Sequence, residues 1–304
     1  MTNSAAASIP SFPSPNAASL SAQAGLARRF GGVARLYGAA ALARFERAHV
    51  CVIGVGGVGS WAVEALARSA IGHITMIDLD NLAESNVNRQ IHALTDTLGM
   101  AKVTALAERI AQINPACRVT QVEQFLTADT LATMIGAHDY DFIIDAIDDV
   151  PAKTALIAYC RSNRLRLVTI GGAGGQIDPT RIEVRDLCRT EQEPLLAKVR
   201  KRLRAEHGFP RGTKNKFHID AVFSTEPLRF PEIETAPAHA NTSDADDSER
   251  DAPAAAGISG LNCAGFGSAV VVTGAFGLVA AAHVLRLLAA DVAVAAAVPA
   301  SAAA

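Results

Sequence analysis

The feature that most constrains the fold is a short apolar run that ends in glycines and continues as a helix. Val50-Cys51-Val52-Ile53 is solidly apolar, as expected of a strand buried on both faces. The turn Gly54-Val55-Gly56-Gly57-Val58-Gly59 follows, and Trp61, Val63 and Leu66 then recur at helical spacing. Glycines let the backbone approach phosphates, and a helix N-terminus offers N–H donors, so this order favours a nucleotide-binding loop. The alternative is a turn that only packs a strand against a helix.

Strand and helix patterns alternate along the next part of the chain. Further apolar runs predict strands at residues 74–77, 118–122, 140–144 and 165–170. A helical pattern that begins at residue 100 stops at Asn114-Pro115. This alternation predicts a mainly parallel sheet with helices on both faces. We therefore expect an α/β fold, a doubly wound Rossmann-like sheet with an additional C-terminal lobe.

Changes in composition suggest how the 304 residues are organised. We expect a disordered Ala/Ser/Pro-rich tail over residues 1–24 and an ATP-binding Rossmann-like domain over residues 25–186. A second lobe follows over residues 187–290, in which residues 198–216 hold eight Lys and Arg and residues 232–256 form an acidic loop. Residues 291–304 are an Ala-rich tail.

Cysteine usage and one apolar stretch bear on the compartment. The five cysteines form no C-x-x-C pair, which argues against a disulfide scaffold and against a Cys-rich zinc site. We expect a cytoplasmic protein. Residues 264–282 are apolar and uncharged over about the length of a membrane span. Because this stretch is rich in Gly, Ala and Ser, we expect a buried core helix, and a membrane span is the weaker alternative.

A group of polar residues follows the second predicted strand. Asp78 ends that strand, where Rossmann folds carry the acid that binds the ribose, and Asp80 comes two residues later. The run Ser85-Asn86-Val87-Asn88-Arg89-Gln90 and the later Lys102 complete the set. Cleavage of ATP between its α and β phosphates develops charge that an Arg and a Lys would neutralise. Each cation alone is equally well explained as a solvated surface charge, whereas the whole set predicts ATP.

These motifs resemble those of the ThiF/MoeB family of ubiquitin-activating-like adenylating enzymes. In that family a substrate carboxylate attacks the α-phosphate of ATP and forms an acyl-adenylate. The resemblance implies a role for each matching residue: Gly56 faces the phosphates, Asp78 binds the ribose, Asn86, Arg89 and Lys102 hold the triphosphate, and Asp148 of Asp145-Ala146-Ile147-Asp148-Asp149 organises Mg²⁺. Arg89, Lys102 and Asp148 are the implied catalytic residues. A monovalent cation site stays an open possibility.

Four longer segments resemble one branch of the family, which dehydrates threonylcarbamoyladenosine in tRNA. They are RFGGVARLYG at 29–38, NRQIHAL at 88–94, GGAGGQIDP at 171–179 and VFSTE at 222–226, and the likeness covers residues 25–290. In this branch the threonyl carboxylate of the modified adenosine next to the anticodon is adenylated. An atom of the nucleoside's own ureido group then displaces AMP, which gives a cyclic product. The resemblance implies tRNA as substrate, a homodimer, and sulfur-transfer proteins as further partners.

The tRNA substrate gives the basic stretch a function. Residues 198–216 would bind RNA phosphates, and Phe209, Phe217 and His218 are either base-stacking candidates or core residues. An internal nucleophile needs no enzyme thiol, so Cys188 and Cys263 are expected to serve packing. An arginine that reaches across the dimer in relatives has Gly32 in its place here, and Arg35 is the remaining candidate.

Three other functions are compatible with parts of the pattern. The chain could adenylate the C-terminus of a ubiquitin-like or sulfur-carrier protein, although the missing C-x-x-C pair and the basic stretch argue against this. A nicotinamide oxidoreductase would leave Arg89, Lys102 and Asp148 without a role. An inactive nucleotide-binding module is disfavoured because all the ATP residues are present.

Overall fold

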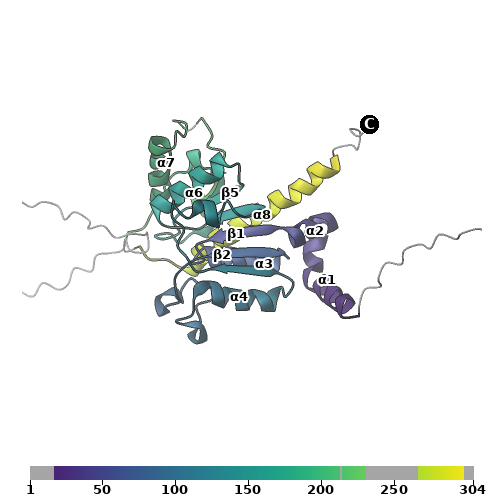
Figure 1. Ribbon diagram of the computed structural model, residues 1–304. Helices are drawn as coiled ribbons and strands as arrows, with labels where there is room; N and C mark the ends of the chain where they lie inside the picture. Colours follow the sequence, from purple (N-terminus) through teal and green to yellow (C-terminus); the bar gives the residue numbers. More distant parts are fainter. Residues whose placement is uncertain (1–16, 213, 231–265, 298–304) are drawn as a thin grey trace, which may run out of the picture.

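The computed structural model describes residues 17–212, 214–230 and 266–297 (Figure 1). Its strands are β1 (His49–Ile53), β2 (His73–Ile77), β3 (Arg118–Val122), β4 (Phe142–Asp145), β5 (Leu167–Ile170), β6 (Ile182–Asp186) and β7 (Asp220–Ser224). Its α-helices are α1 (Ala17–Tyr37), α2 (Ala39–Arg47), α3 (Gly59–Arg68), α4 (Lys102–Ile113), α5 (Leu131–Met134), α6 (Val150–Ser162), α7 (Pro194–Glu206) and α8 (Val270–Ala297).

The seven strands form one sheet in the order β3-β2-β1-β4-β5-β7-β6. Every neighbouring pair is parallel except β6 and β7, which are antiparallel. The chain moves outward from β1 to β3 on one side and restarts beside β1 with β4 on the other. Such a reversal of strand order leaves a crevice at the carboxyl ends of the two central strands. The predicted doubly wound, mainly parallel sheet is confirmed.

Side chains of each strand alternate between two cores, one on each face of the sheet. Val50 and Val52 of β1 pack into a core with α3, α4 and α8, whereas Cys51 and Ile53 pack into a second core with α5, α6 and α7. Because both faces are covered, the central strands are apolar at nearly every position, which explains the continuous apolar runs in the sequence. The helix predicted from residue 100 begins at Lys102 and ends, as predicted, before Asn114.

Three of the expected boundaries can be compared with the elements of the structure. Helix α1 begins at Ala17, inside the expected tail 1–24, and residues 1–16 lie outside the described residues. The boundary at residue 186 falls inside the sheet, because β7 pairs with both β5 and β6. Helix α8 continues to Ala297 and takes in the first half of the Ala-rich tail, since alanine has the highest helix propensity. The acidic loop 232–256 lies outside the described residues.

Helix α8 contains most of the apolar stretch at residues 264–282, for which a core helix was expected and a membrane span was the weaker alternative. From Val270 to Val294 it is long and apolar enough to cross a membrane, and just over half of its apolar window is buried inside the protein. Gly277 lies so close to α3 that a Cβ atom there would be 2.3 Å from the Val58 carbonyl oxygen. The absence of a side chain at Gly277 therefore allows α8 to pack closely against the start of α3. In Figure 1 the yellow end of α8 extends past the sheet.

Candidate nucleotide-binding site

A cavity of about 610 Å³ opens at the carboxyl ends of the parallel strands, where the strand order reverses. Ten of the predicted site residues line it: Gly54, Gly56, Gly57, Asp78, Asp80, Asn86, Arg89, Lys102, Asp148 and Asp149. Three others, Gly59, Ser85 and Asn88, do not line it. The sheet thus gathers residues from five separate segments at one edge.

The glycine turn after β1 requires glycine for geometric reasons. Gly54 has a φ of 79°, and a Cβ there would lie 2.8 Å from the Ala146 carbonyl oxygen. A Cβ on Gly59 would lie 1.9 Å from the Gly54 carbonyl oxygen, so this glycine serves the contact between turn and helix. Gly57 lies against the Arg89 side chain, with its ideal Cβ position 3.0 Å from Arg89 Cγ. Two glycines thus shape the turn and one makes room for a cation at the cavity.

Asp78, Asp80 and Lys102 form a charged network at one wall. The Val55 N–H donates to Asp78 Oδ2 at 2.8 Å and the Asp80 N–H to Asp78 Oδ1 at 2.9 Å, which ties the carboxylate to the glycine turn. Lys102 Nζ lies 2.6 Å from Asp80 Oδ2 and 3.8 Å from Asp78 Oδ1. Burial raises the pKa of Asp78, although Lys102 and the two N–H groups oppose this shift. Lys102 is almost fully buried, which argues against the solvated-charge alternative.

The Ser85–Gln90 motif forms a compact turn that presents Arg89. Asn86 Oδ1 accepts from the Ala83 N–H, and Arg89 Nη1 donates to the Ser85 carbonyl at 2.6 Å and to Asn88 Oδ1 at 2.9 Å. Burial lowers the pKa of the Arg89 guanidinium. Ser85 and Asn88 therefore contact Arg89, and Asn88 also donates to the Ser268 carbonyl. The contacts of Ser85 and Asn88 are thus with Arg89 and with Ser268, just before α8, and not with the cavity.

The acidic residues after β4 have different environments. Asp148 is exposed at the cavity, whereas Asp149 caps α6 by accepting from the Ala152 N–H at 2.8 Å. Asp145 is fully buried, 2.9 Å from Lys153 Nζ, and also accepts from the Thr169 hydroxyl. No group of three or more His, Cys, Asp or Glu side chains suited to a metal occurs within the described ranges. Asp148 beside phosphate oxygens would nevertheless suit Mg²⁺, which favours one or two carboxylates plus phosphates.

The cavity has lining residues that were not among the predicted sites. Gln124, Phe125, Leu126 and Thr127 follow β3, and Gly171, Gly172, Ala173 and Gly174 follow β5, while Gln90, Ser268 and Thr273 come from other segments. The first two groups could have been found by treating every strand end as part of the edge. The Ser268 and Thr273 contribution depends on where α8 packs, which no local pattern reveals.

The basic stretch is split between structural and exposed cations. Arg200 donates to Thr190, Arg202 pairs with Glu206 at 2.8 Å, and Arg204 lies over the Phe217 ring. We define the basic surface as the exposed cations Lys198, Lys201, Arg211, Lys214 and Lys216. Phe209 and Phe217 are buried in the core, so neither is available to stack on a base. His218 is exposed.

Two further sequence candidates lie away from the cavity. Arg35 is exposed at the last turn of α1 and is not a lining residue. Cys188 is 2% exposed, and burial raises the pKa of its thiol, as expected of a packing cysteine. Cys263 lies outside the described residues.

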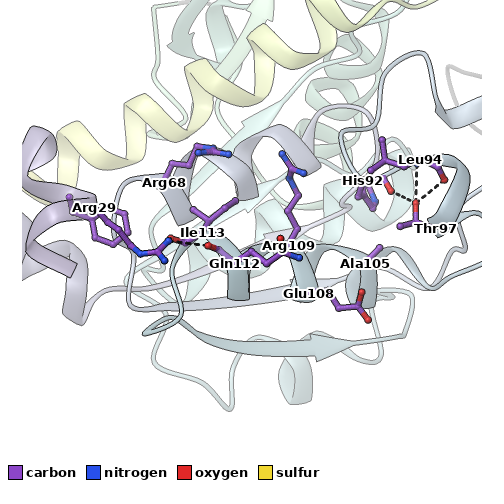
Figure 2. A pocket seen from close by; sticks show the side chains of 11 residues that line it. Arg29, Arg68, His92, Leu94, Thr97, Ala105, Glu108, Arg109, Gln112 and Ile113 are labelled. Atoms are coloured by element: carbon purple, nitrogen blue, oxygen red, sulfur yellow. Dashed lines mark hydrogen bonds between the residues drawn. The ribbon is translucent and has the colours of Figure 1, made fainter. Parts of the chain in front are cut away.

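A second cavity, of about 510 Å³, lies beside α4 and contains none of the predicted site residues. Figure 2 shows Arg29 reaching the end of α4, where it donates to the Gln112 and Ile113 carbonyls. Arg68 and Arg109 also line this cavity, and both pair with Glu64. Arg29 and Arg109 join α4 to α1 and to α3, whereas Arg68 pairs within α3, so these cations have structural partners.

The strand order and the residues at its edge define a Rossmann-like nucleotide-binding protein. The chain belongs to the ThiF family, whose sequence pattern matches residues 30–300. It is 52% identical over 261 residues to the tRNA threonylcarbamoyladenosine dehydratase of Escherichia coli (strain K12), a match that covers 85% of this chain and 92% of the relative. The Haemophilus influenzae protein of the same name is 46% identical and covers 86% and 93%.

Solved structures show the same similarity in three dimensions. The crystal structure of the E. coli tRNA N6-threonylcarbamoyladenosine dehydratase in complex with ATP superimposes with a TM-score of 0.76 at 49% identity. The match covers 88% of this chain and 97% of that one. A structure of the same E. coli protein with AMP matches equally well.

Proposed function

We propose that this protein catalyses the ATP-dependent cyclodehydration of N6-threonylcarbamoyladenosine in tRNA. One observation carries the proposal: the phosphate, ribose and cation residues line a single cavity in a chain 52% identical to a relative of that name. The threonyl carboxylate attacks the α-phosphate of ATP and forms an acyl-adenylate with release of pyrophosphate. A ureido atom then attacks the acyl carbon, AMP leaves, and the ureido group loses a proton.

The cavity residues would divide the work of the first step. The backbone at Gly56 and Gly57 faces the phosphates, and Asp78, fixed by two backbone N–H groups, accepts from the ribose. Arg89 and Lys102 neutralise charge on the triphosphate, with phosphates competing against Asp80 for Lys102. Asp148 would hold Mg²⁺, which supplies electrostatic stabilisation of the phosphates when bound.

The basic surface is the proposed docking site for tRNA. Its five cations lie on α7 and the loop after it, and the neighbouring α6 is capped at its N-terminus by Asp149, which lines the cavity. Exposed Lys and Arg bind RNA mainly by neutralising phosphates, so affinity should fall steeply with salt. A substrate held there would reach the cavity from the side of α6 and α7.

The assembly and compartment that accompany this function are also proposals. The family resemblance supports a homodimer, sulfur-transfer proteins as further partners, and a cytoplasmic location. Sedimentation of the purified protein tests the first of these.

Pyrophosphate release tests the proposed function against its same-chemistry alternative. With ATP, we expect release that depends on tRNA carrying threonylcarbamoyladenosine and that is absent with unmodified tRNA. Release that requires a carrier protein with a free C-terminus, and no RNA, would instead establish carrier adenylation. Thermal stabilisation by NAD but not by ATP would exclude both.

A further inference from the structure

Glu193 lies buried behind the wall of the nucleotide cavity. Its side chain is 4% exposed and caps α7, with Oε1 accepting from the Leu195 N–H at 3.2 Å and Oε2 accepting from the Leu196 N–H. Oε1 also accepts from the Gly172 N–H at 2.9 Å, which links the cap to the loop after β5. Gly171 packs directly on this side chain, since a Cβ there would lie 2.9 Å from Glu193 Cγ.

A buried ion pair, Lys153 with Asp145, lies next to Glu193 and belongs to the same polar network. Lys153 is fully buried and pairs with Asp145 at 2.9 Å. Burial raises the pKa of Glu193, and the N–H donors around it and Lys153 oppose this shift. Asp145 in turn accepts from the Thr169 hydroxyl on β5 and from the Ile147 N–H of the loop that carries Asp148. The loops after β4 and β5 are thus held by one buried polar network.

The hydrogen bond to Glu193 fixes the direction of the Gly171–Gly172 peptide. In a planar trans peptide the N–H and the preceding C=O point in opposite directions. Gly171 and Gly172 both line the cavity, whereas Glu193 does not. With the Gly172 N–H directed at Glu193, the Gly171 carbonyl oxygen points away from Glu193, and it belongs to a peptide whose two residues line the cavity. A backbone carbonyl held in this way is a preorganised acceptor for an N–H donor.

We propose that the Gly171 carbonyl accepts a hydrogen bond from an N–H of the substrate's ureido group, and that Glu193 is the positioning residue that aims this carbonyl. The inference rests on the proposed function and deepens it. The ureido group of threonylcarbamoyladenosine carries N–H groups and must lie against the acyl carbon to close the ring. A fixed acceptor keeps it there, which raises the effective molarity of the internal nucleophile.

The consequence appears in the fate of the acyl-adenylate. With the ureido group aligned, it attacks the acyl carbon, AMP leaves, and one pyrophosphate accompanies each cyclic nucleoside. With the ureido group misaligned, water attacks the same carbon and regenerates the free carboxylate plus AMP. ATP is then consumed without product, so the ratio of pyrophosphate to cyclic nucleoside rises.

The test measures that ratio in Glu193→Gln with purified modified tRNA and ATP. Glutamine retains one acceptor oxygen and adds an NH₂ group that conflicts with the N–H donors around it. We expect the ratio to rise about fivefold, the effect of one lost hydrogen bond, with the KM for ATP unchanged. A merely structural role would lower pyrophosphate and product equally and leave the ratio at one.

Asp186→Asn is the matched control. Asp186 also accepts three backbone N–H groups, from Cys188, Phe217 and His218, but none of these residues lines the cavity. Its ratio should stay at one. If Glu193→Gln does not fold, Gly171→Ala decides, because its Cβ would push the same peptide away from Glu193.

The outcomes separate the inference from the function beneath it. A ratio of one in both Glu193→Gln and Gly171→Ala, with cyclic product still formed, overturns the inference alone. Absence of cyclic product from the unmodified protein overturns the proposed function. A raised ratio in Glu193→Gln or Gly171→Ala, beside a ratio of one in Asp186→Asn, supports the positioning role.

Discussion

Replacement of the buried Lys153 tests how much the polar network behind the nucleotide cavity contributes to the free energy of unfolding. Lys153 and Asp145 are both fully buried, and Lys153 Nζ lies 2.9 Å from Asp145 Oδ1. Lys153→Met keeps a chain of similar length but leaves the Asp145 carboxylate without its cation. Removing one partner of a buried ion pair typically costs about 3–5 kcal/mol, because the remaining charge is uncompensated.

The surrounding hydrogen bonds set where in that range the loss should fall. Asp145 would keep the Thr169 hydroxyl at 2.7 Å and the Ile147 N–H at 3.1 Å, so it would not be wholly unsatisfied. Glu193 would lose an electrostatic partner at the same time. We therefore expect a loss of about 3 kcal/mol, near the low end for a broken buried pair.

Urea unfolding followed by circular dichroism measures this loss. In the double variant Asp145→Asn/Lys153→Met no buried charge remains at this pair, and asparagine can still accept from the Ile147 N–H. We expect it to recover about 2 kcal/mol relative to the single variant, since replacing both partners is far less costly than breaking the pair. A single variant that loses less than about 1 kcal/mol would refute the reasoning, because that is the range of an exposed pair.

Four further predictions follow from the site and the cores. Asp148→Ala should fold normally and reduce turnover about 100-fold or more, measured as cyclic nucleoside per minute, whereas near-normal turnover removes Asp148 from the mechanism. Alanine at Lys198, Lys201, Lys214 and Lys216 should weaken tRNA binding and flatten its salt dependence in filter binding without changing ATP affinity, unlike the paired Arg202→Ala. Burial lowers the pKa of His49 and His73 to about 4, so the folded state binds fewer protons than the unfolded state, and stability in thermal melts should fall as pH drops from 6.5 toward 4. Cys188→Ala/Cys263→Ala should still cyclise the nucleoside, and a folded, ATP-binding variant without product would favour a thioester route.

The sequence predicted the part of the fold that local patterns encode. Apolar runs such as Val50–Ile53 identified the central strands, because a strand buried on both faces has no polar positions. The position of β7 was not predicted. Its short apolar run follows the basic stretch, and insertion between β5 and β6 is a long-range pairing that no local pattern specifies. The extension of α8 was missed although its alanines favour a helix.

In the candidate site, too, the residues marked by local motifs were predicted, and those that depend on long-range packing were not. Asp78, Arg89 and Lys102 were predicted because strand ends and charged motifs are visible in one dimension, and the structure brings them to one cavity. The sequence left Phe217 as a candidate either for base stacking or for the core, since an aromatic residue beside lysines suits both. Its burial in the structure assigns it to the core. Glu193 carried no signal at all. Its significance comes from a contact with Gly172, and only the packing of α7 against the loop after β5 creates that contact.

Mass spectrometry of nucleosides tests the central claim most directly. tRNA that carries threonylcarbamoyladenosine is incubated with the protein and ATP, digested, and compared with the same reaction without ATP. We predict that the threonylcarbamoyladenosine signal is replaced, only when ATP is present, by a nucleoside lighter by one water. An unchanged nucleoside in the presence of folded, ATP-binding protein would contradict the assignment of this cavity to tRNA cyclodehydration.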